Sequence, residues 1–374
     1  MPNIKSGIFI MPFHPPDKEL AKCHDEDMEL LIESDKLGID EFWVGEHHTL
    51  SWEPIVSPEM FIAAGFRQTK RIRIGPAPLL LNFHHPAQVA NRLSFLDHFS
   101  HGRLNIAFGH GGAPSDFELY NLRSSEMQEM SEEAMGMILE MWEKEPPYEI
   151  TGNYWNIALK SSDEDIGYGK IQKPLQTPYP PISVPITGYD SNSAKIAAKY
   201  GFSPFSHSIT SLPVLRDNWE TYSSASRLAN NEPARSNWKL ARTIFIADSD
   251  EEAIKKARNN SISKAYKYLA AAIKKGPGLS IMKSDPNNPD SEITEDYLIN
   301  ELVIAGSVET VISRLQEIIE YLGPFGTLIN MSFDWIDESD KKDWLNSMAL
   351  FQNEVIPKLS SQINQSIALE NSND

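Results

Sequence analysis

The sequence predicts a single (β/α)₈ barrel of the TIM type, because short β-rich runs alternate with amphipathic helical runs along nearly the whole chain. The rival arrangement, an open doubly wound sheet, would need a glycine-rich nucleotide-binding turn after the first strand. Residues 12–16 stand there instead and read Pro-Phe-His-Pro-Pro. The eight expected strands are residues 4–11, 41–44, 71–81, 103–108, 182–187, 202–207, 239–247 and 326–333.

Each strand is followed by a run with helical spacing of its apolar residues. The first helix, residues 25–37, stops at Gly38, and the second, residues 57–69, begins with Ser57 as a cap and Pro58 in its first turn. The other expected helices are residues 86–99, 127–144, 192–200, 212–229, 251–269, 308–322 and 341–356.

Two insertions interrupt this alternation. The first, about residues 146–181 after the fourth strand, ends in the proline-dense run QTPYPP. The second, about residues 273–297 after the seventh strand, is rich in Gly, Pro, Asn and Asp, and a loop of that length is typical of a lid over a site. We therefore expect one barrel domain over residues 1–359, followed by a polar C-terminal tail over 360–374.

Composition excludes several classes of function. The formal net charge of −18 disfavours binding to nucleic acid or to anionic membrane surfaces. Cys23 is the only cysteine, which excludes an internal disulfide and a cysteine-rich metal site. The N-terminal region lacks the features of a secretory signal, and no run approaches 18 apolar residues. The sequence therefore predicts a soluble, cytoplasmic protein.

Histidines gather where the expected strands end, which is where a (β/α)₈ barrel places its reactive groups. Seven of the 10 histidines lie at or just beyond these ends, namely His14, His47, His48, His84, His85, His110 and His207. A single histidine there is as often structural as functional, but the grouping favours a site. Because successive side chains of an extended chain point to opposite sides, we expect only one of His47 and His48 to face the barrel mouth.

Two neighbouring strand ends suggest an anion site. Backbone N–H groups and hydroxyls at the start of a helix bind phosphate, and the run after strand five provides them through Gly188, Tyr189, Asp190, Ser191, Asn192 and Ser193. Plain helix capping by Asp190 or Ser191 is the alternative for this run alone. His110 and Gly111 follow the adjacent strand four, and the two elements together favour a phosphate site.

Proline is out of place inside strand three, where residues 75–78 read Gly-Pro-Ala-Pro. This pattern indicates an interruption of the strand ladder. A cis bond before proline costs only about 0.5–1 kcal/mol and is an inexpensive way to form such a bulge.

These runs resemble the bacterial luciferase-like flavin monooxygenases, and most of all the branch that includes limonene monooxygenase-like enzymes. The resemblance covers about residues 4–355. It is carried by GIFIMPFHPP, by FWVGEHHTLSWEP and by NFHHPAQVANRLSFLDHFSHGRLNIAFGHGG, which contains the pattern L-D-x-x-S-x-G-R-L. The combination of the Glu-His-His run with these later runs is more specific than any one motif.

The resemblance implies a TIM-barrel homodimer that uses reduced FMN (FMNH₂) from a separate NAD(P)H-flavin reductase, with O₂ as co-substrate. The catalytic histidine of the family falls on His47. Its phosphate-binding turn falls on residues 190–193 with Ser193 at the hydroxyl position, whereas its phosphate-contacting arginine falls on His110, a weaker partner for phosphate. A cis peptide bond beneath the flavin ring falls on Ala77 and Pro78, and we predict that this bond is cis.

The implied reaction oxygenates a small apolar organic substrate through a flavin C4a-(hydro)peroxide. His47 would stabilise the peroxide or move its proton. We expect aromatic and histidine side chains at the barrel rim to form the substrate pocket and exclude water, with residues 274–291 as a lid. The expected pocket residues are Phe13, His14, His48, Trp52, Phe83 and Trp335.

Three alternatives stay open at this point. They are a deazaflavin (F420)-dependent dehydrogenase on the same barrel, a metal-dependent hydrolase, and a non-catalytic flavin-binding protein. Neither an H-x-H pair at strand one nor an H-E-x-x-H helix is present to support a metal. The organic substrate is not identified by the sequence, and epoxidation, hydroxylation and Baeyer–Villiger insertion are all compatible with an apolar pocket.

Overall fold

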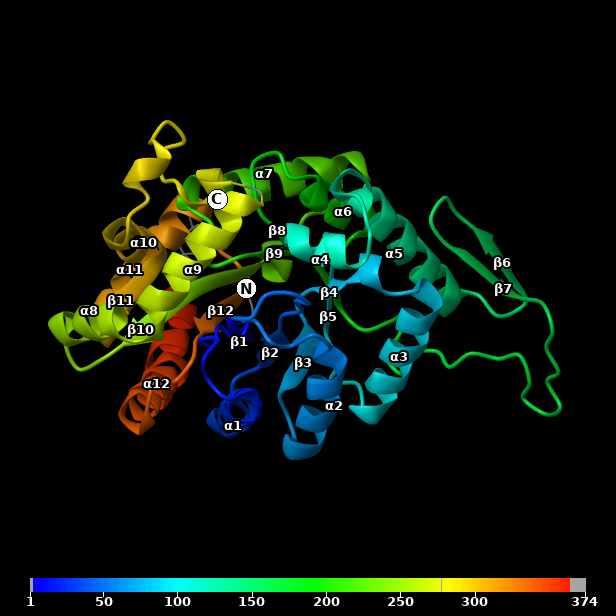
Figure 1. Cartoon of the computed structure of the whole chain (residues 1–374), viewed down its shortest axis with the longest axis horizontal. Coiled ribbons are helices and arrows are strands. Elements are labelled where there is room, and N and C mark those ends of the chain that lie inside the picture. The colour runs from blue at the N-terminus through cyan, green and yellow to red at the C-terminus, as the bar shows by residue number, and fades with distance from the viewer. Residues whose placement is uncertain (1–2, 277, 364–374) are drawn as a thin grey trace, which may run out of the picture.

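The computed structural model describes residues 3–276 and 278–363 and shows a nearly closed barrel of parallel strands surrounded by helices (Figure 1). The strand β1 (Lys5–Ile10) lies between β2 (Glu41–Val44), which pairs with β3 (Arg73–Pro76), and β12 (Thr327–Ser332). The predicted TIM-type barrel is confirmed. From β12 the order continues through β10 (Lys239–Ile246), β9 (Ser203–Ser206), β8 (Ile182–Ile186), β5 (Ile106–Gly109) and β4 (Leu79–Leu80).

The third expected strand is two short strands, β3 and β4, which are separated at Ala77 and Pro78. The peptide bond between these two residues is cis, as predicted. Proline has no N–H to give to the ladder, so the run 71–81 cannot pair continuously. Beyond the break β4 pairs with β5, and Ile74 of β3 bridges to Leu104. The barrel closes at this seam.

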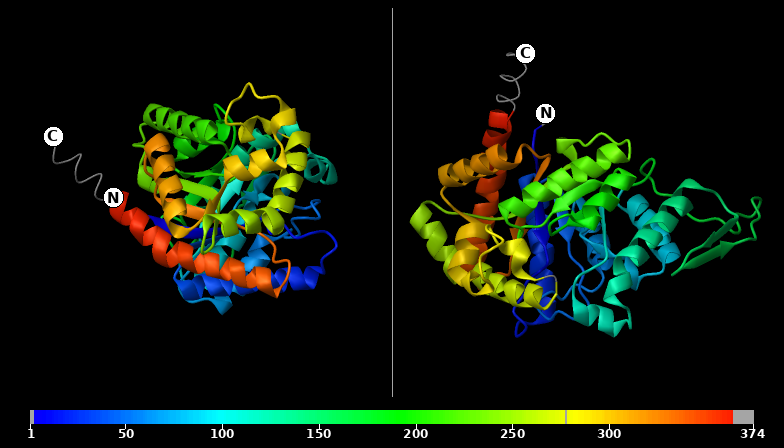
Figure 2. Two further views of the ribbon diagram at one scale, coloured as in Figure 1. Left: turned by 90° about the vertical axis from the view of Figure 1, so that its left-hand side faces the viewer. Right: turned by 90° about the horizontal axis from the view of Figure 1, so that it is seen from above.

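Helices cover the outer face of the barrel (Figures 1 and 2). They are α1 (Leu20–Leu37), α2 (Pro58–Gln68), α3 (Pro86–Phe99), α5 (Met127–Glu143), α6 (Asn192–Tyr200), α7 (Leu212–Leu228), α11 (Val308–Leu322) and α12 (Glu338–Leu350), which continues through a π-helical turn, Phe351–Val355. The expected helix 251–269 is two helices, α8 (Asp250–Asn259) and α9 (Ser261–Lys275). Asn260 adopts an extended conformation, and its side chain accepts a hydrogen bond from the Ile262 N–H at 2.9 Å, which starts the second helix.

The two expected insertions have regular structure of their own. The first contains an antiparallel hairpin, β6 (Tyr148–Thr151) with β7 (Asn156–Leu159), which projects from the barrel beyond α5 (Figures 1 and 2). The second was expected to be an unstructured loop, but it holds the end of α9, two short 3-10 turns and α10. These elements are Leu279–Met282, Asp290–Glu292 and Glu295–Leu302, and they are followed by an unpredicted strand, β11 (Val303–Gly306), which pairs with β10.

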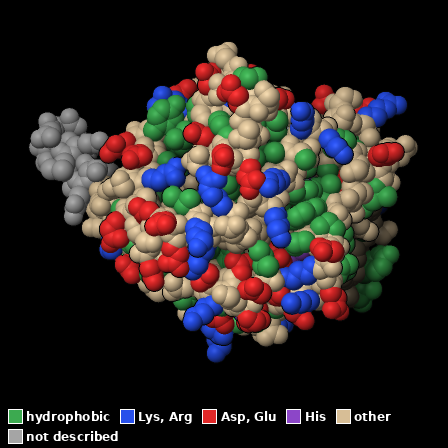
Figure 3. Space-filling model, turned by 60° about the vertical axis from the view of Figure 1, so that its left-hand side comes forward, with side chains coloured by type: hydrophobic (Ala, Val, Ile, Leu, Met, Phe, Trp, Pro, Cys, Tyr) green, Lys and Arg blue, Asp and Glu red, His purple; other side chains and the backbone are tan. Residues whose placement is uncertain are grey.

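The expected tail lies mostly outside the described residues. Residues 360–363 are helical, and residues 364–374 are not described. In the described parts of the chain, no helix is both long and apolar enough to cross a membrane. Over the face seen in Figure 3, acidic and basic side chains are interspersed.

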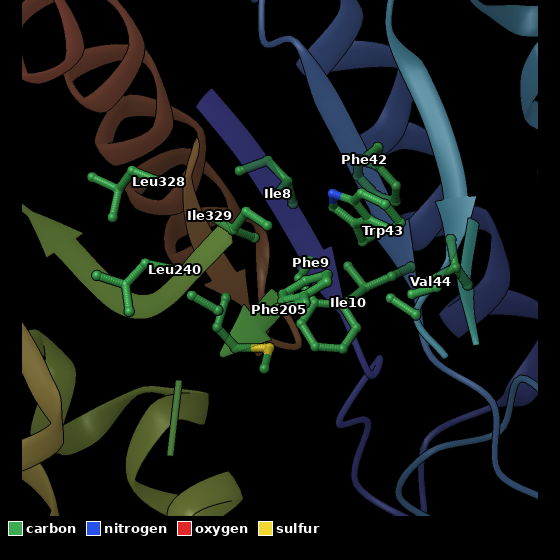
Figure 4. Close-up of a cluster of buried hydrophobic side chains, with 14 of the residues drawn as sticks. Ile8, Phe9, Ile10, Phe42, Trp43, Val44, Phe205, Leu240, Leu328 and Ile329 are labelled. Carbon is green, nitrogen blue, oxygen red and sulfur yellow. The ribbon is translucent and has the colours of Figure 1, made fainter. Parts of the chain in front are cut away.

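Aromatic side chains fill the lower part of the barrel interior. The Phe205 ring lies 5.8 Å from that of Phe9 and 5.3 Å from that of Trp43, and all three side chains are buried (Figure 4). Below them Lys239 donates hydrogen bonds to the carboxylate of Glu41 at 3.0 and 3.1 Å. The cavity of the barrel lies beyond this filling, toward the C-terminal ends of the strands, which is the usual place for a site in this fold.

Candidate active site

A cavity of about 480 Å³ lies at the C-terminal ends of the strands. Strand ends form its floor, and its walls come from the loop after β5, the start of α4 (Pro114–Leu119), α5, α6 and α9. Most of the lining is apolar, as in Leu80, Phe108, Met135, Ile196, Ile209 and Leu269. A cavity of this size with a few polar groups is typical of a site for a small molecule.

His47 follows β2 and lines the cavity between two carboxyl groups. Its Nδ1 lies 3.1 Å from Oδ2 of Asp116 on α4, and its Nε2 lies 3.3 Å from Oε2 of Glu53. Burial lowers the pKa of His47, but the charge of Glu53 and the hydrogen bond and charge of Asp116 outweigh it and raise the pKa. His47 therefore keeps its proton to higher pH than an exposed histidine does.

The two carboxyl groups beside His47 have different surroundings. Asp116 accepts hydrogen bonds from the Thr49 N–H at 2.8 Å and from the Thr49 hydroxyl. Burial raises the pKa of Asp116, but these bonds and His47 outweigh it, so the pKa is lowered. Among the described residues, Glu53 accepts a hydrogen bond from the hydroxyl of Tyr268 alone, at 2.7 Å, and burial raises the pKa of Glu53. Asp116 is therefore the carboxyl group that ionises more readily.

The neighbouring histidine, His48, does not line the cavity. Its Nε2 lies 2.8 Å from Oε1 of Glu46, and the same oxygen lies 2.9 Å from Nε2 of His84. The other ring nitrogen of His48 lies 2.9 Å from the hydroxyl of Tyr120, and the Leu80 N–H donates to the second oxygen of Glu46. One of the two adjacent histidines therefore faces the cavity, as the alternation of side chains predicts, and the other packs behind the wall.

The expected anion-binding run lies partly at the cavity. Ser193, His110 and Gly111 line it, and so does Pro78. Gly188, Tyr189, Asp190, Ser191, Asn192 and Ala77 are not among the lining residues. Burial lowers the pKa of His110, so this ring is neutral at physiological pH. Ser191 stands at the N-cap of α6 without a capping hydrogen bond from its side chain, and the carboxylate of Asp190 pairs with Lys195 at 2.7 Å.

The expected substrate-pocket residues lie outside the cavity lining. Phe13 is fully buried and stacks on Phe333, and Trp52 stacks on the outer side of Tyr268, whose own side chain does line the cavity. Phe83 packs against Tyr120, and Trp335 is buried near the end of β12. These aromatic side chains support the cavity walls. They do not form its surface.

His14 is also placed behind the wall, where it ties the loop after β1 to the end of β12. Its ring nitrogens contact Asp334 and Asp27, and all three side chains are buried. Burial lowers the pKa of His14, but the two aspartates outweigh it and raise the pKa to about 9. This histidine serves the fold.

The His14 contacts predict that stability falls at alkaline pH. Because the folded-state pKa lies above the ordinary value of 6.5, the contribution is complete below pH 6.5 and is lost as pH rises through about 9. We expect a loss of roughly 2–3 kcal/mol over this range. Urea unfolding at pH 6, 7.5 and 9 measures it. The variant His14→Gln should lack this step, and an equal step in the variant would contradict the assignment.

Several cavity residues were not found from the sequence. They are Met11 directly after β1, His207 directly after β9, Glu53 in the loop after β2, and Tyr268 and Lys275 on α9. His207 is buried, with Nε2 3.3 Å from the sulfur of Met11, and burial together with the charge of His47 lowers its pKa to about 4. His207 was one of the strand-end histidines, so its position was the one available signal. The α9 residues had no such signal, because the sequence predicts a helix that leads into a loop over this stretch.

The model of the luciferase-like monooxygenase family matches residues 4–324. The chain belongs to this family. It is 29% identical to 2,5-diketocamphane 1,2-monooxygenase 1 of Pseudomonas putida, over 95% of this chain and 99% of that protein. It is 27% identical to limonene 1,2-monooxygenase of Rhodococcus erythropolis, over 96% of this chain and 88% of that protein.

A solved structure of a luciferase-like monooxygenase has the same architecture. It is the oxygenating constituent of 3,6-diketocamphane monooxygenase from Pseudomonas putida, a type II Baeyer–Villiger enzyme in complex with FMN. It superposes with a TM-score of 0.87 and 26% identity, over 96% of this chain and 99% of that chain. The expected family membership is therefore confirmed.

The residues present fit a flavin mononucleotide. At the floor, a Cβ added to Gly109 would lie 2.7 Å from Pro78, so glycine is required for the close packing of these two lining residues. At Gly112 an added Cβ would meet no atom within 4 Å, which leaves open space beside the loop after β5. The Ser193 hydroxyl and the first N–H groups of α6 provide donors for a phosphate at one end. Among the described lining residues, Lys275 is the one Lys or Arg.

Proposed function

We propose that this chain is the oxygenase component of a two-component monooxygenase, which uses FMNH₂ and O₂ to oxygenate a small apolar organic substrate. The observation that carries the proposal is the position of His47. It is a proton-carrying group on the wall of an apolar cavity that also has donors for a phosphate. Membership of the luciferase-like monooxygenase family supports the same reaction class.

Two groups of cavity residues would hold the cofactor. Ser193, the start of α6, Gly111 and Lys275 would hold the phosphate, while Pro78 and Gly109 would lie beneath the ring system. When bound, reduced FMN supplies the electrons that activate O₂.

The protein supplies proton control and protection from water. His47 lines the cavity, with Nδ1 beside Asp116 and Nε2 beside Glu53, and can donate a proton to an oxygen atom of a bound ligand. Leu269 and Ile273 of α9, together with Ile209, cover the cavity with apolar surface, which excludes water and strengthens polar interactions inside. Only the end of α9 belongs to the second insertion, and among the described residues of 274–291 Lys275 is the one that lines the cavity, so the lid expected of this run stays a prediction.

One experiment tests the cofactor and the reaction together. The protein is titrated with FMN and with a deazaflavin, and quenching of tryptophan fluorescence reports binding. The FMN complex is then reduced and mixed with ¹⁸O₂ and a panel of apolar ketones, alkenes and aldehydes. We expect FMN binding and one ¹⁸O atom in one product class. Deazaflavin binding with hydride transfer would contradict the proposal, and hydrogen peroxide alone with every substrate would favour a non-catalytic flavin carrier.

We also propose a homodimer that forms through α2 and α3. Met60 on α2 and Phe95 on α3 are 76% and 58% exposed, and Val56 just before α2 is 52% exposed. Large apolar side chains that gather on two packed helices are typical of a protein–protein interface. We expect light scattering to give the mass of two chains for the natural protein and of one chain for the variant Met60→Asp/Phe95→Asp. A dimer that is unchanged by this double substitution would place the interface elsewhere.

A further inference from the structure

Glu53 is a buried carboxyl group on the cavity wall with an incomplete set of hydrogen bonds. It is 3% exposed, and it follows the His47 loop. Oε1 accepts the hydroxyl of Tyr268 at 2.7 Å. Oε2 has no hydrogen-bond partner among the described residues and lies 3.3 Å from Nε2 of His47. A buried ionised carboxylate normally has more donors than this, because its desolvation is costly.

The charges around Glu53 and His47 do not decide which of these two groups carries a proton. No Lys or Arg side chain in the described part of the chain forms an ion pair with Glu53 or His47. The titratable groups that face this pair from the surrounding elements are Asp116 on α4, Tyr268 on α9, Glu46 at the end of β2 and His207 after β9. Since Asp116 has its own donors, His47 would face two buried negative charges if Glu53 were also ionised.

The hydrogen bond from Tyr268 also indicates which oxygen of Glu53 would carry a proton. Because Oε1 accepts the tyrosine hydroxyl, a proton on this carboxyl group belongs to Oε2. Oε2 is the atom next to His47 Nε2. The proton can therefore stand on either of two adjacent atoms, and the total charge of the buried group is the same in both cases.

We propose that Glu53 is a positioning residue that shares a single proton with His47, so that the pair, and not His47 alone, is the acid–base group of this site. The role in turnover rests on the proposed monooxygenase function, whereas the shared proton does not. Coupled groups of this kind titrate with two apparent pKa values that belong to the pair. Tyr268 extends the pair to α9, so the helix that covers the cavity also orients its proton donor.

The first test needs no flavin. Histidine-ring NMR signals are followed against pH in the natural protein and in Glu53→Gln, with His47 identified by the signal lost in His47→Gln. Removing the negative charge of Glu53 should lower the pKa of His47 by about one unit or more. Infrared difference spectra over the same pH range should show a protonated carboxyl band that is absent from Glu53→Gln.

The second test follows product formation with reduced FMN as a function of pH. In Glu53→Gln, the alkaline limit of kcat should move to lower pH, and the maximal rate should fall by about 10-fold. The variant Glu53→Asp restores the charge and should move the limit back toward its natural position. A residue that only filled space would give the same pH limit in all three proteins.

The matched control is Glu59→Gln. Glu59 is another buried glutamate of the same region, but it is paired with Arg92 at 3.0 Å and does not line the cavity. This variant should leave the pKa of His47 and the pH limit unchanged.

An unchanged His47 pKa in Glu53→Gln, or a Glu53 carboxylate that is ionised throughout pH 5–9, overturns the proposal. If Glu53→Gln does not fold, the infrared titration of the natural protein and Glu53→Asp decide. Failure of the natural protein to bind FMN contradicts only the proposed function.

Discussion

Replacing His47 with alanine is expected to lower the yield of oxygenated product by about 100-fold while FMN stays bound. His47 lines the cavity and carries a proton between Asp116 and Glu53, whereas the residues placed at the phosphate lie on other elements. Without this donor, activated oxygen leaves the site as hydrogen peroxide. Product and peroxide are measured in a single turnover of the reduced FMN complex with O₂, and FMN binding is measured by fluorescence.

His98→Ala is a suitable control for this substitution. His98 is exposed on α3, its Nε2 lies 3.0 Å from the carbonyl oxygen of Lys173, and it does not line the cavity. The control should keep both product yield and FMN affinity. An undiminished yield in His47→Ala would refute the role of this histidine, and loss of FMN binding in the same variant would show that His47 holds the cofactor.

The barrel could be predicted because its pattern is local. Strands buried on both faces are short apolar runs, and helices between them keep one apolar stripe, so the two periods separate along the chain. The strand β11 (Val303–Gly306) escaped this pattern because it is only a four-residue run that directly follows α10. The break at Asn260 escaped because one residue that starts a second helix does not change the helical spacing on either side.

The sequence predicts only those residues of the candidate site that lie close to the ends of strands or to the start of the following helix. His47, Pro78, His110 and Gly111 come within three residues of a strand end, Ser193 stands at the start of the helix after β8, and all five line the cavity. The expected aromatic rim failed to reach the lining because side-chain direction in a loop depends on the turn. Phe13, for example, has a positive φ of 40° and points into the core against Phe333.

The partners of His47 come from distant segments that the sequence does not bring together. Asp116 lies on α4 and Tyr268 on α9, which are 69 and 221 positions away from it along the chain. A carboxylate beside His47 is therefore a consequence of how the loops pack over the barrel mouth. No local sequence motif predicts this carboxylate. Glu53 lies six positions after His47, and only its burial and its contact with Tyr268 distinguish it from other glutamates.

The double variant Ser193→Ala/Lys275→Ala is expected to weaken FMN binding by about 10- to 100-fold and to leave riboflavin binding nearly unchanged. His110 is held neutral by burial, so it brings no positive charge to a phosphate. The donors assigned to the phosphate are the Ser193 hydroxyl, the start of α6, the loop at Gly111 and Lys275 at the end of α9. Riboflavin has the same ring but no phosphate, so the ratio of the two dissociation constants isolates this end of the cavity.

Lys274→Ala provides the matched control, because Lys274 is the preceding exposed lysine of α9 and does not line the cavity. It changes the net charge by the same amount as Lys275→Ala and should leave FMN affinity unaltered. Since Lys275 is exposed, its share of the affinity should also decline as salt rises from 50 mM to 500 mM, and the double variant should lack that salt dependence. Equal losses of FMN and riboflavin affinity would mean that these residues shape the cavity as a whole. The assignment of Ser193 and Lys275 to the phosphate would then be wrong.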